Sequence, residues 1–380
     1  MEGFIVNIEC PECRYSAGVD PLLIPRNTKT LKCPECRESF RISDELAEIV
    51  GDNPEKTTTS ADPESPHSNK AKPVFHGNGT TLFSVYIMNY LKTLLTLGVY
   101  YFWGKTRVRN YLYSQSEFMG ERFSYLGTGM ELFTGWLKAF VIILIFFIGP
   151  QLLAEFVHPA YIIIVYVSML IFIPIAMVGT RRYRLSRSRW HGVRFSFRGT
   201  FKEGLKVFIK GYLLTLITLG IYAPFFHVDM QRFWRGNSYY GNLGFNYTGD
   251  GKDLLKYYLV VFVLFLPTMG LSWVWYKARK TRYDWENTTL GGNEDGSQTL
   301  KFSSELTGER LLGFLLINLL LLVLTLGLAF AWIEVRKMNF AFEFIDTKGS
   351  VDFEKVREKA QEADAMGEGL LDAFDMDFGF

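Results

Sequence analysis

The stretch Phe123-Ser-Tyr125-Leu-Gly127-Thr-Gly129 recurs 122 residues later as Phe245-Asn-Tyr247-Thr-Gly249-Asp-Gly251. The match extends upstream without a gap, because Leu97-Gly98 falls on Leu219-Gly220 at the same offset. An internal repeat of this kind indicates that one structural unit is used more than once. A third copy of the hydrophobic part is Leu324-Thr-Leu-Gly327. We therefore expect repeats at about residues 75–145, 195–275 and 300–350.

A smaller unit lies inside these repeats. It consists of a hydrophobic helix, a basic helical extension, a glycine turn and a short strand, and it occurs five times. The basic extension is clear in Lys277-Ala-Arg-Lys-Thr-Arg282. Apolar and polar residues alternate in Arg194-Phe-Ser-Phe-Arg198, which is typical of a half-buried strand. The unit therefore predicts helices joined by short β-hairpin-like connections.

The hydrophobic segments have the length and composition of membrane spans. They are apolar nearly all round, whereas a core helix of a soluble protein would keep a polar face. Aromatic residues make up 16% of the 380-residue chain, which fits the aromatic belts of membrane interfaces. The sequence predicts a mainly α-helical, multi-pass transmembrane bundle with internal repeats over residues 73–350. The six expected spans are about 82–103, 130–150, 160–180, 204–226, 254–276 and 310–333.

All cysteines of the chain lie in its first 36 residues, as Cys10-Pro-Glu-Cys13 and Cys33-Pro-Glu-Cys36. Two CxxC pairs at this spacing offer four thiolates to one tetrahedral zinc ion, which closes its coordination sphere. A redox dithiol and two disulfides are the alternatives, and the identical composition of the two pairs favours zinc. We expect residues 1–41 to form a small β zinc ribbon around a structural Zn²⁺ ion.

Two further segments flank the predicted membrane domain. Residues 42–72 are polar and have almost nothing to bury, so we expect a disordered linker. Residues 351–380 form an acidic tail, which either docks on the basic loops or is solvated. The ribbon would suit a protein partner. Nucleic acid is disfavoured, since the basic residues of the ribbon are offset by acidic ones.

Several motifs together resemble one family. They are Phe75-His-Gly-Asn-Gly79, the Thr-Leu-Gly-Val/Ile-Tyr helix end, and Gly120-Glu-Arg-Phe-Ser-Tyr-Leu-Gly-Thr-Gly129. The combination is similar to the YjgN-like bacterial inner-membrane proteins, a family of unknown function, over about residues 73–380. The resemblance implies a multi-pass protein of the bacterial inner membrane. It implies no catalytic residue or ligand.

The distribution of basic residues gives a conflict about topology. Loops 104–129, 181–203 and 277–309 carry 17 Lys and Arg residues, against none in 151–159 and three in 227–253. Basic loops mark the cytoplasmic side. Six crossings would then place both termini outside, whereas a reduced zinc ribbon belongs in the cytosol. Re-entrant Thr-Leu-Gly segments, with Lys92 and Gly98 marking a break in the first, would resolve the conflict, and we expect a cytosolic ribbon.

Two groups of residues are candidate sites within the membrane domain. Lys92, Asn89 and Asn318 are polar residues inside predicted spans, which suits a solute path, although interhelical hydrogen bonding explains the asparagines as well. A second group suits anionic lipid headgroups, with a simple positive-inside anchor as the alternative. Its members are Arg181, Arg182, Arg184, Arg187 and Arg189.

The sequence leaves two classes of function open. Repeats and broken hydrophobic helices favour transport or permeation of a small solute or lipid. The tethered ribbon favours a membrane scaffold or sensor that recruits a cytosolic partner. An enzyme is not expected, since the chain has no Walker loop, no G-x-S-x-G elbow and no HExxH motif. Membrane lipids are expected contacts in either case, and no oligomeric state is indicated.

Overall fold

The computed structural model describes residues 70–291 and 299–349, the residues Val351, Phe353 and Val356, and four short strands in the first 41 residues. The chain divides into two compact units, Met1–His67 and Ser68–Phe380. In the second unit, the described residues are mainly helical.

Two antiparallel strand pairs are present in the first unit. Strand β1 (Val6–Glu9) pairs with β2 (Ser16–Val19), and β3 (Thr30–Lys32) pairs with β4 (Ser39–Arg41). Each CxxC sequence lies between the two strands of one pair. The cysteines themselves are outside the described residues, so the predicted zinc ribbon stays a prediction.

The second unit repeats one arrangement five times within residues 70–349: a pair of helices followed by short strands. Four pairs are simple: α2 (Gly79–Leu95) with α3 (Tyr101–Ser114), α7 (Phe201–Ile217) with α8 (Ala223–Gly236), α9 (Gly251–Leu264) with α10 (Ser272–Glu286), and α11 (Gly308–Leu324) with α12 (Phe330–Glu343). The second pair in the chain is longer. Its first arm is α4 (Gly129–Ile143), the π-helical η2 (Leu144–Ile148) and α5 (Gly149–Phe156), and its second arm is the 3₁₀ turn η3 (Pro159–Tyr161) and α6 (Ile162–Arg187).

The strands between the helix pairs form two antiparallel sheets, of nine and three strands, which the chain joins into a ring. They are β5 (Lys70–Ala71), β6 (Val74–Phe75), β7 (Ser116–Phe118), β8 (Glu121–Arg122), β9 (Ser124–Tyr125), β10 (Ser188–Trp190), β11 (Val193–Phe197), β12 (Ser238–Tyr240), β13 (Leu243–Tyr247), β14 (Thr288–Gly291), β15 (Thr299–Ser304) and β16 (Ile345–Lys348). Neighbouring strands pair in chain order from β9 to β16, and β16 pairs with β5. Strand β6 continues β5 and pairs with β7, while β8 pairs with β7 and leads into β9. The two sheets are joined by the chain itself, because β5 leads into β6 and β8 leads into β9, so together they complete a ring.

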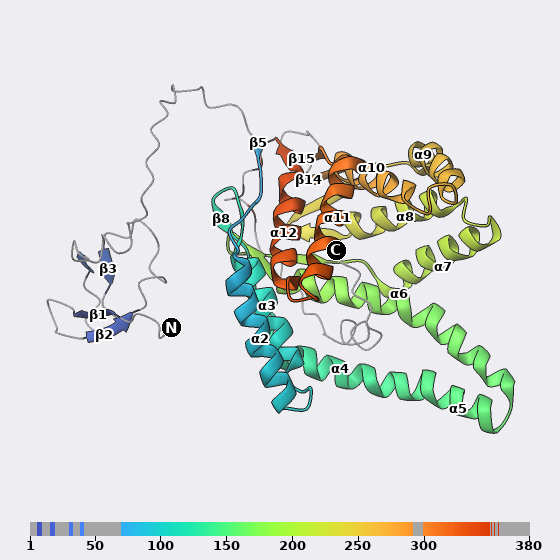
Figure 1. The fold of residues 1–380 in the computed structure, drawn as a ribbon, viewed down its shortest axis with the longest axis horizontal. Helices are drawn as coiled ribbons and strands as arrows, with labels where there is room; N and C mark the ends of the chain where they lie inside the picture. Colours follow the sequence, from blue (N-terminus) through green and yellow to red (C-terminus); the bar gives the residue numbers. More distant parts are fainter. Residues whose placement is uncertain are drawn as a thin grey trace. The chain divides into compact units, whose positions relative to one another are not determined.

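The helices pack in the same cyclic order. The second helix of each pair contacts the first helix of the next pair: α3 with α4, α6 with α7, α8 with α9 and α10 with α11. Helix α12 closes the cycle on α2, and Figure 1 shows these two helices, red and blue, side by side. The close packing depends on glycine, because an added Cβ at Gly79 would lie 2.3 Å from the Trp332 ring, and one at Gly251 would lie 2.5 Å from Phe225.

Each helix pair begins at a capped N-terminus. The side chain of the residue before the first helix accepts a hydrogen bond from a backbone N–H of the first turn, which satisfies one of the donors left free there. The five capping residues are Asn78, Thr128, Thr200, Asp250 and Thr307. The Gly-x-Gly sequences are thus turns that lead into capped helices, as the sequence indicated.

Four of the five pairs turn sharply at a Thr-x-Gly sequence. In the first, Leu97 and Gly98 adopt φ values of 51° and 95°. The Gly98 N–H donates to the Thr93 carbonyl at 2.8 Å, as in a Schellman cap. The Thr96 hydroxyl donates to the Lys92 carbonyl at 2.8 Å and accepts from the Tyr100 N–H at 2.9 Å, so one side chain joins both helices. The turns centred on Gly220, Gly270 and Gly327 repeat these bonds.

These turns correct the expected number of spans. Two helices of the described residues are long and apolar enough to cross a membrane, Gly129–Phe156 and Pro159–Arg187. They correspond to the predicted spans 130–150 and 160–180, and Figure 1 shows them as one long hairpin. The other four predicted spans, 82–103, 204–226, 254–276 and 310–333, are each divided into two helices by a Thr-x-Gly turn.

The inside of the strand ring is an aromatic and aliphatic core. Trp190, Tyr240 and Leu300 are at most 4% exposed there. Phe353, from the segment predicted to be an acidic tail, packs edge-on against Trp190 with 4.9 Å between the ring centroids. Val356 belongs to the same core. The described residues of this segment therefore pack against apolar side chains that the basic loops themselves supply, such as Trp190 of loop 181–203.

Candidate functional site

A cavity of about 900 Å³ lies among helices from four of the five repeating units. Helices α6, α7, α8, α10, α11 and α12 and strands β15 and β16 contribute to its wall. Because these elements are distant in sequence but successive in the cyclic packing, the cavity faces the middle of the second unit. We call it the ring cavity.

The polar part of the ring cavity is organised around Asp284 of α10. This side chain is buried, at 6% exposure. One carboxylate oxygen lies 2.9 Å from Nε2 of His227, and the other accepts a 2.8 Å hydrogen bond from the Tyr247 hydroxyl. Arg235 donates to the main-chain carbonyl of Asp284. Both carboxylate oxygens are thus engaged, as expected for a buried charge.

Cations outnumber carboxylates on the cavity wall. Arg235, Lys277 and Lys280 line it, and Asp284 is the acidic residue among the lining residues. Burial lowers the pKa of the Lys280 ammonium, with Asp284 acting in the opposite sense and Lys277 adding to the decrease. Burial also lowers the pKa of Arg235. The cavity therefore has a positive end that Asp284 only partly compensates.

The rest of the cavity wall is apolar. It is lined by Met177 of α6, Phe208 of α7, Phe226 of α8, Phe340 of α12, and Phe344, which directly follows α12. A cavity that combines convergent polar groups with apolar walls is the usual form of a small-molecule site.

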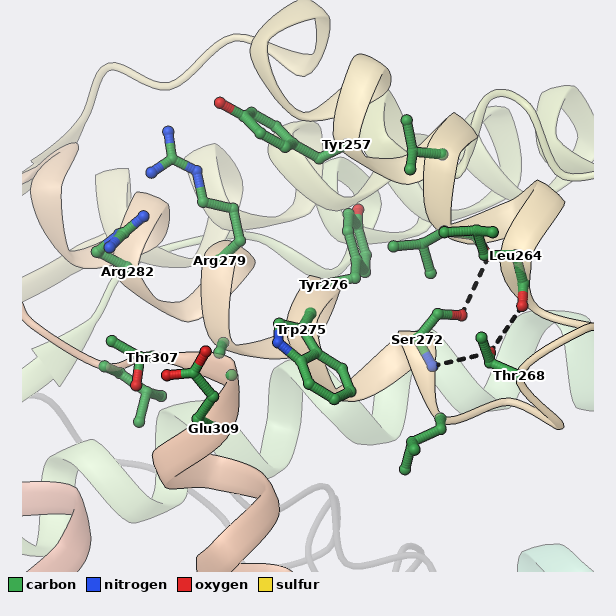
Figure 2. Close-up of a pocket in the computed structure, with 16 residues that line it drawn as sticks. Tyr257, Leu264, Thr268, Ser272, Trp275, Tyr276, Arg279, Arg282, Thr307 and Glu309 are labelled. Carbon is green, nitrogen blue, oxygen red and sulfur yellow. Dashed lines mark hydrogen bonds between the residues drawn. The ribbon is translucent and has the colours of Figure 1, made fainter.

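A second hollow, of about 660 Å³, lies between α9, α10 and the start of α11. Figure 2 shows Tyr257 and Arg279 above Trp275, with Glu309 on the opposite wall. The Arg279 guanidinium lies 4.8 Å from the centre of the Tyr257 ring. Arg282 lies 3.8 Å from a Glu286 carboxylate oxygen. Two arginines and Glu309 line this hollow, so its excess of positive charge is smaller than that of the ring cavity, where three cations face one carboxylate.

The three predicted intramembrane polar residues do not meet at one site. Asn89 of α2 donates to the Gly104 carbonyl of α3 at 3.1 Å. Asn318 of α11 accepts from Nε of Arg336 of α12 at 3.1 Å. Each asparagine therefore joins the two helices of its own hairpin, which is the interhelical alternative. The Lys92 ammonium lies 5.4 Å from the centre of the Tyr100 ring.

The five arginines predicted to contact lipid follow α6 into β10. Arg182 donates to the Gly199 carbonyl at 2.7 Å, which ties α6 to the turn before α7. Arg187 makes two hydrogen bonds to Glu131, at 2.8 and 3.0 Å. Among the described residues, the Nε atoms of Arg181 and Arg189 are buried without a hydrogen-bond partner, whereas Arg184 has a partner within the fold. Lipid contact by these arginines stays a prediction. Arg182 and Arg187 make hydrogen bonds that stabilise the packing of α6 against neighbouring segments.

The polar residues of the ring cavity were missed at the sequence level. His227 and Asp284 are 57 positions apart, and their contact depends on the packing of successive units. One weak signal was present: Asp284 follows the basic run 277–282 after a single residue, and Glu286 comes two positions later. The sequence does not show which of these carboxylates has a partner in another unit.

Comparison with protein families matches residues 71–274 and 257–373 to the family described as bacterial protein of unknown function (DUF898). The inner membrane protein YjgN of Escherichia coli O157:H7 is 31% identical over 129 residues, which cover 34% of this chain and 31% of that protein. The protein of the same name from Salmonella typhimurium strain LT2 is 27% identical over 158 residues, 38% of this chain and 39% of its own length. The chain thus spans between about a third and two fifths of the length of these curated relatives. No solved structure gives a significant match.

Proposed function

The chain belongs to the DUF898 family of bacterial proteins of unknown function, and from that premise we propose that it is an inner-membrane protein that binds and moves a small solute or lipid. The names of the relatives support the membrane location. Transport rests on one observation, the ring cavity. The proposal includes no catalytic role.

Apolar side chains exposed at the hairpin turns support insertion of the helix pairs into the membrane from one side. Leu97, Leu219, Met269 and Leu326 stand at the four Thr-x-Gly turns and are between 84% and 95% exposed. Large apolar side chains at such exposure indicate contact with lipid or with a partner. The backbone polar groups at the turns are bonded internally, which a lipid environment requires. A 17-residue helix spans about 25 Å, less than the roughly 30 Å hydrocarbon core.

We propose that only the long hairpin, α4–α5 with α6, crosses the membrane, and that the four short hairpins re-enter. All five hairpins start and end at the strand ring, so the ring lies on one side of the membrane. The basic loops 104–129, 181–203, 227–253 and 277–309 then share that side, and loop 151–159, which has no Lys or Arg, lies opposite. This arrangement resolves the topology conflict and keeps both termini in the cytosol.

A substitution that fills the ring cavity tests the binding role. Ala341 of α12 lines the cavity, so Ala341→Trp reduces the available volume. We expect the full chain, purified from membranes in mild detergent, to carry a small molecule detectable by native mass spectrometry. Ala341→Trp should lose that molecule. Leu97→Trp at a hairpin tip is the matched control and should retain it. Equal occupancy in both variants would remove the basis for transport.

The predicted zinc ribbon gives a second candidate function. The first unit is a separate compact part of the chain, which suits a tethered module that recruits a cytosolic protein. We propose that Cys10, Cys13, Cys33 and Cys36 bind one structural Zn²⁺ ion. The full chain should then contain one zinc per molecule, and Cys33→Ser should lose it. A scaffold role predicts that removal of residues 1–67 abolishes recruitment of the cytosolic protein, while the ring cavity still binds its small molecule.

A further inference from the structure

The ring cavity holds cations whose charge is not matched by the buried carboxylate. The Asp284 oxygens are taken by His227 and Tyr247, at 2.9 and 2.8 Å. Within the described part of the chain, Lys280 makes no ion pair or hydrogen bond, although it lies one helical turn from Asp284. Lys277 lies one turn before Lys280 on the same helix and repels it. The lysines therefore face the cavity with Asp284 as a partial counter-charge.

A further arginine adds to the positive potential next to the cavity. Arg181 of α6 lies close enough to Arg235 for the two guanidinium groups to repel each other. The Nε atom of Arg181 is buried and has no hydrogen-bond partner in the part of the chain that the structure describes. Charges held in a low-dielectric region without partners cost free energy, and an anion placed between them would offset that cost.

The apolar wall restricts what kind of anion fits. A small hydrophilic anion would leave Phe208, Phe226 and Phe340 in contact with water inside the cavity. A molecule with an apolar chain would cover these rings while its charged end reached the lysines. Burial of apolar surface and charge-assisted hydrogen bonds would then both favour the complex.

We infer that the ring cavity binds an amphiphilic anion, whose phosphate or carboxylate end is held by Lys280, Lys277 and Arg235 and whose apolar part lies along the phenylalanine wall. This inference rests on the proposed function, because it names the class of molecule that the cavity takes. A membrane lipid and a free phosphate share the headgroup chemistry.

Binding of three probes to the full chain in detergent distinguishes these sources. The probes are lysophosphatidylglycerol, which is anionic, lysophosphatidylcholine, which is zwitterionic, and inorganic phosphate. We expect lysophosphatidylglycerol to bind at least about tenfold more tightly than lysophosphatidylcholine, as one charge-assisted contact would give. Phosphate binding as strong as that of the anionic lipid, with the same dependence on Lys280, would overturn the amphiphilic part of the inference.

Neutralisation of one lysine tests the headgroup contact. Lys280→Gln should lower the affinity for lysophosphatidylglycerol about tenfold and leave the affinity for lysophosphatidylcholine unchanged. Lys280→Arg should keep the preference, and Lys301→Gln, on the exposed face of β15, is the matched control. If Lys280→Gln does not fold, Lys277→Gln, at a more exposed position, should lower the preference in the same direction.

The outcomes separate the inference from the proposed function. Equal binding of both lysolipids, unchanged in Lys280→Gln, would overturn the anionic preference while the cavity remained a binding site. If Ala341→Trp does not reduce the binding of either lysolipid, the cavity is not the binding site. That result would contradict the proposed function as well.

Discussion

The long hairpin and the four short hairpins are built alike and differ at their tips. Both kinds start at a capped residue and return to the strand ring. The tip of the long hairpin carries polar side chains, Gln151, Glu155 and His158. The tips of the short hairpins carry leucine or methionine next to glycine, with a threonine whose hydroxyl is bonded to backbone groups. The long tip therefore presents polar side chains beside its exposed Phe156 and Val157, whereas the short tips present leucine or methionine.

The difference indicates that turn chemistry, more than hydropathy, decides where a hydrophobic helix ends. A Thr-x-Gly turn ends the first helix and starts the second after about 25 Å, with its polar groups satisfied internally. The long hairpin lacks this turn. Its chain continues through η2 into α5 and reverses at His158-Pro159, where Nδ1 of His158 accepts from the Ala160 N–H at 3.1 Å.

The largest expected effect is an all-or-none difference in labelling at the two kinds of tip. Val157→Cys, at the long tip, should react with an impermeant maleimide on intact spheroplasts. Leu97→Cys and Leu326→Cys should not react, because their tips end within the membrane. The native cysteines should react only after permeabilisation, which makes them the internal control. Labelling of Leu97→Cys from outside would restore the six-span topology, and labelling of the native cysteines would place the ribbon outside.

The sequence could predict the repeating unit but not its closure into a ring. The glycine turns, the helix-capping positions and the alternating Phe residues are local signals, and each recurs at a fixed place. The ring depends on pairs such as Thr347 with Ala71, which join the two ends of the second unit across most of its length. Strands of two to six residues carry too little pattern to specify such partners.

The four divided spans show that hydropathy does not predict where a hydrophobic helix breaks. Leu324-Thr-Leu-Gly327 is apolar enough to continue a membrane helix, and an isolated glycine in a helical pattern is often tolerated. The break depends on Leu326, which adopts a φ of 51° that a leucine rarely takes. The cavity is hidden for a related reason: His227 and Asp284 form a site only after successive units pack. Asn89 and Asn318, by contrast, are visible as polar residues, yet they serve the hairpins and not a common site.

The next largest effect compares an ion pair in the long hairpin with one in a short hairpin. Arg187 binds Glu131 through two hydrogen bonds, and the side chains are 19% and 34% exposed. Arg187→Leu should lower the free energy of unfolding by about 2 kcal/mol, because charge-assisted bonds are lost from a partly buried site. The matched change, Arg310→Leu, breaks a 3.5 Å contact to Glu343 between side chains that are about 60% exposed.

The matched change should cost less than about 1 kcal/mol, since exposed pairs contribute little. Unfolding of both variants in the same detergent gives the comparison. Equal losses of unfolding free energy would mean that the ion pair of Arg187 with Glu131 stabilises the long hairpin no more than the exposed pair stabilises the short one.

A smaller effect is expected from glycine substitutions within the short hairpins. Gly98 has a φ of 95° and nothing within 4 Å of an added Cβ, so Gly98→Ala tests conformation alone. We expect a loss of about 1–2 kcal/mol. Gly313 lies inside α11 with equally open surroundings, and Gly313→Ala should stabilise by about 0.5–1 kcal/mol. The melting temperatures of the two variants should therefore move in opposite directions, and a shift of the same sign would rule out the turn as a strained element.

The smallest effect concerns the cavity, whose cations come from the short hairpins while the long hairpin contributes Ile173 and Met177. Burial and Lys277 lower the pKa of Lys280 in the folded state, and Asp284 opposes them. The unfolded chain has an ordinary lysine pKa of about 10.4, so it binds more protons than the folded chain between the lowered pKa and that value. Stability should consequently rise with pH through this alkaline window, by at most about 1.4 kcal/mol per pH unit. Lys280→Gln should flatten this rise relative to Lys301→Gln, and a bound anion should do the same by restoring the charged lysine. Identical pH profiles for the two variants would show that Lys280 is solvated, and the short hairpins would then enclose no electrostatically distinct site.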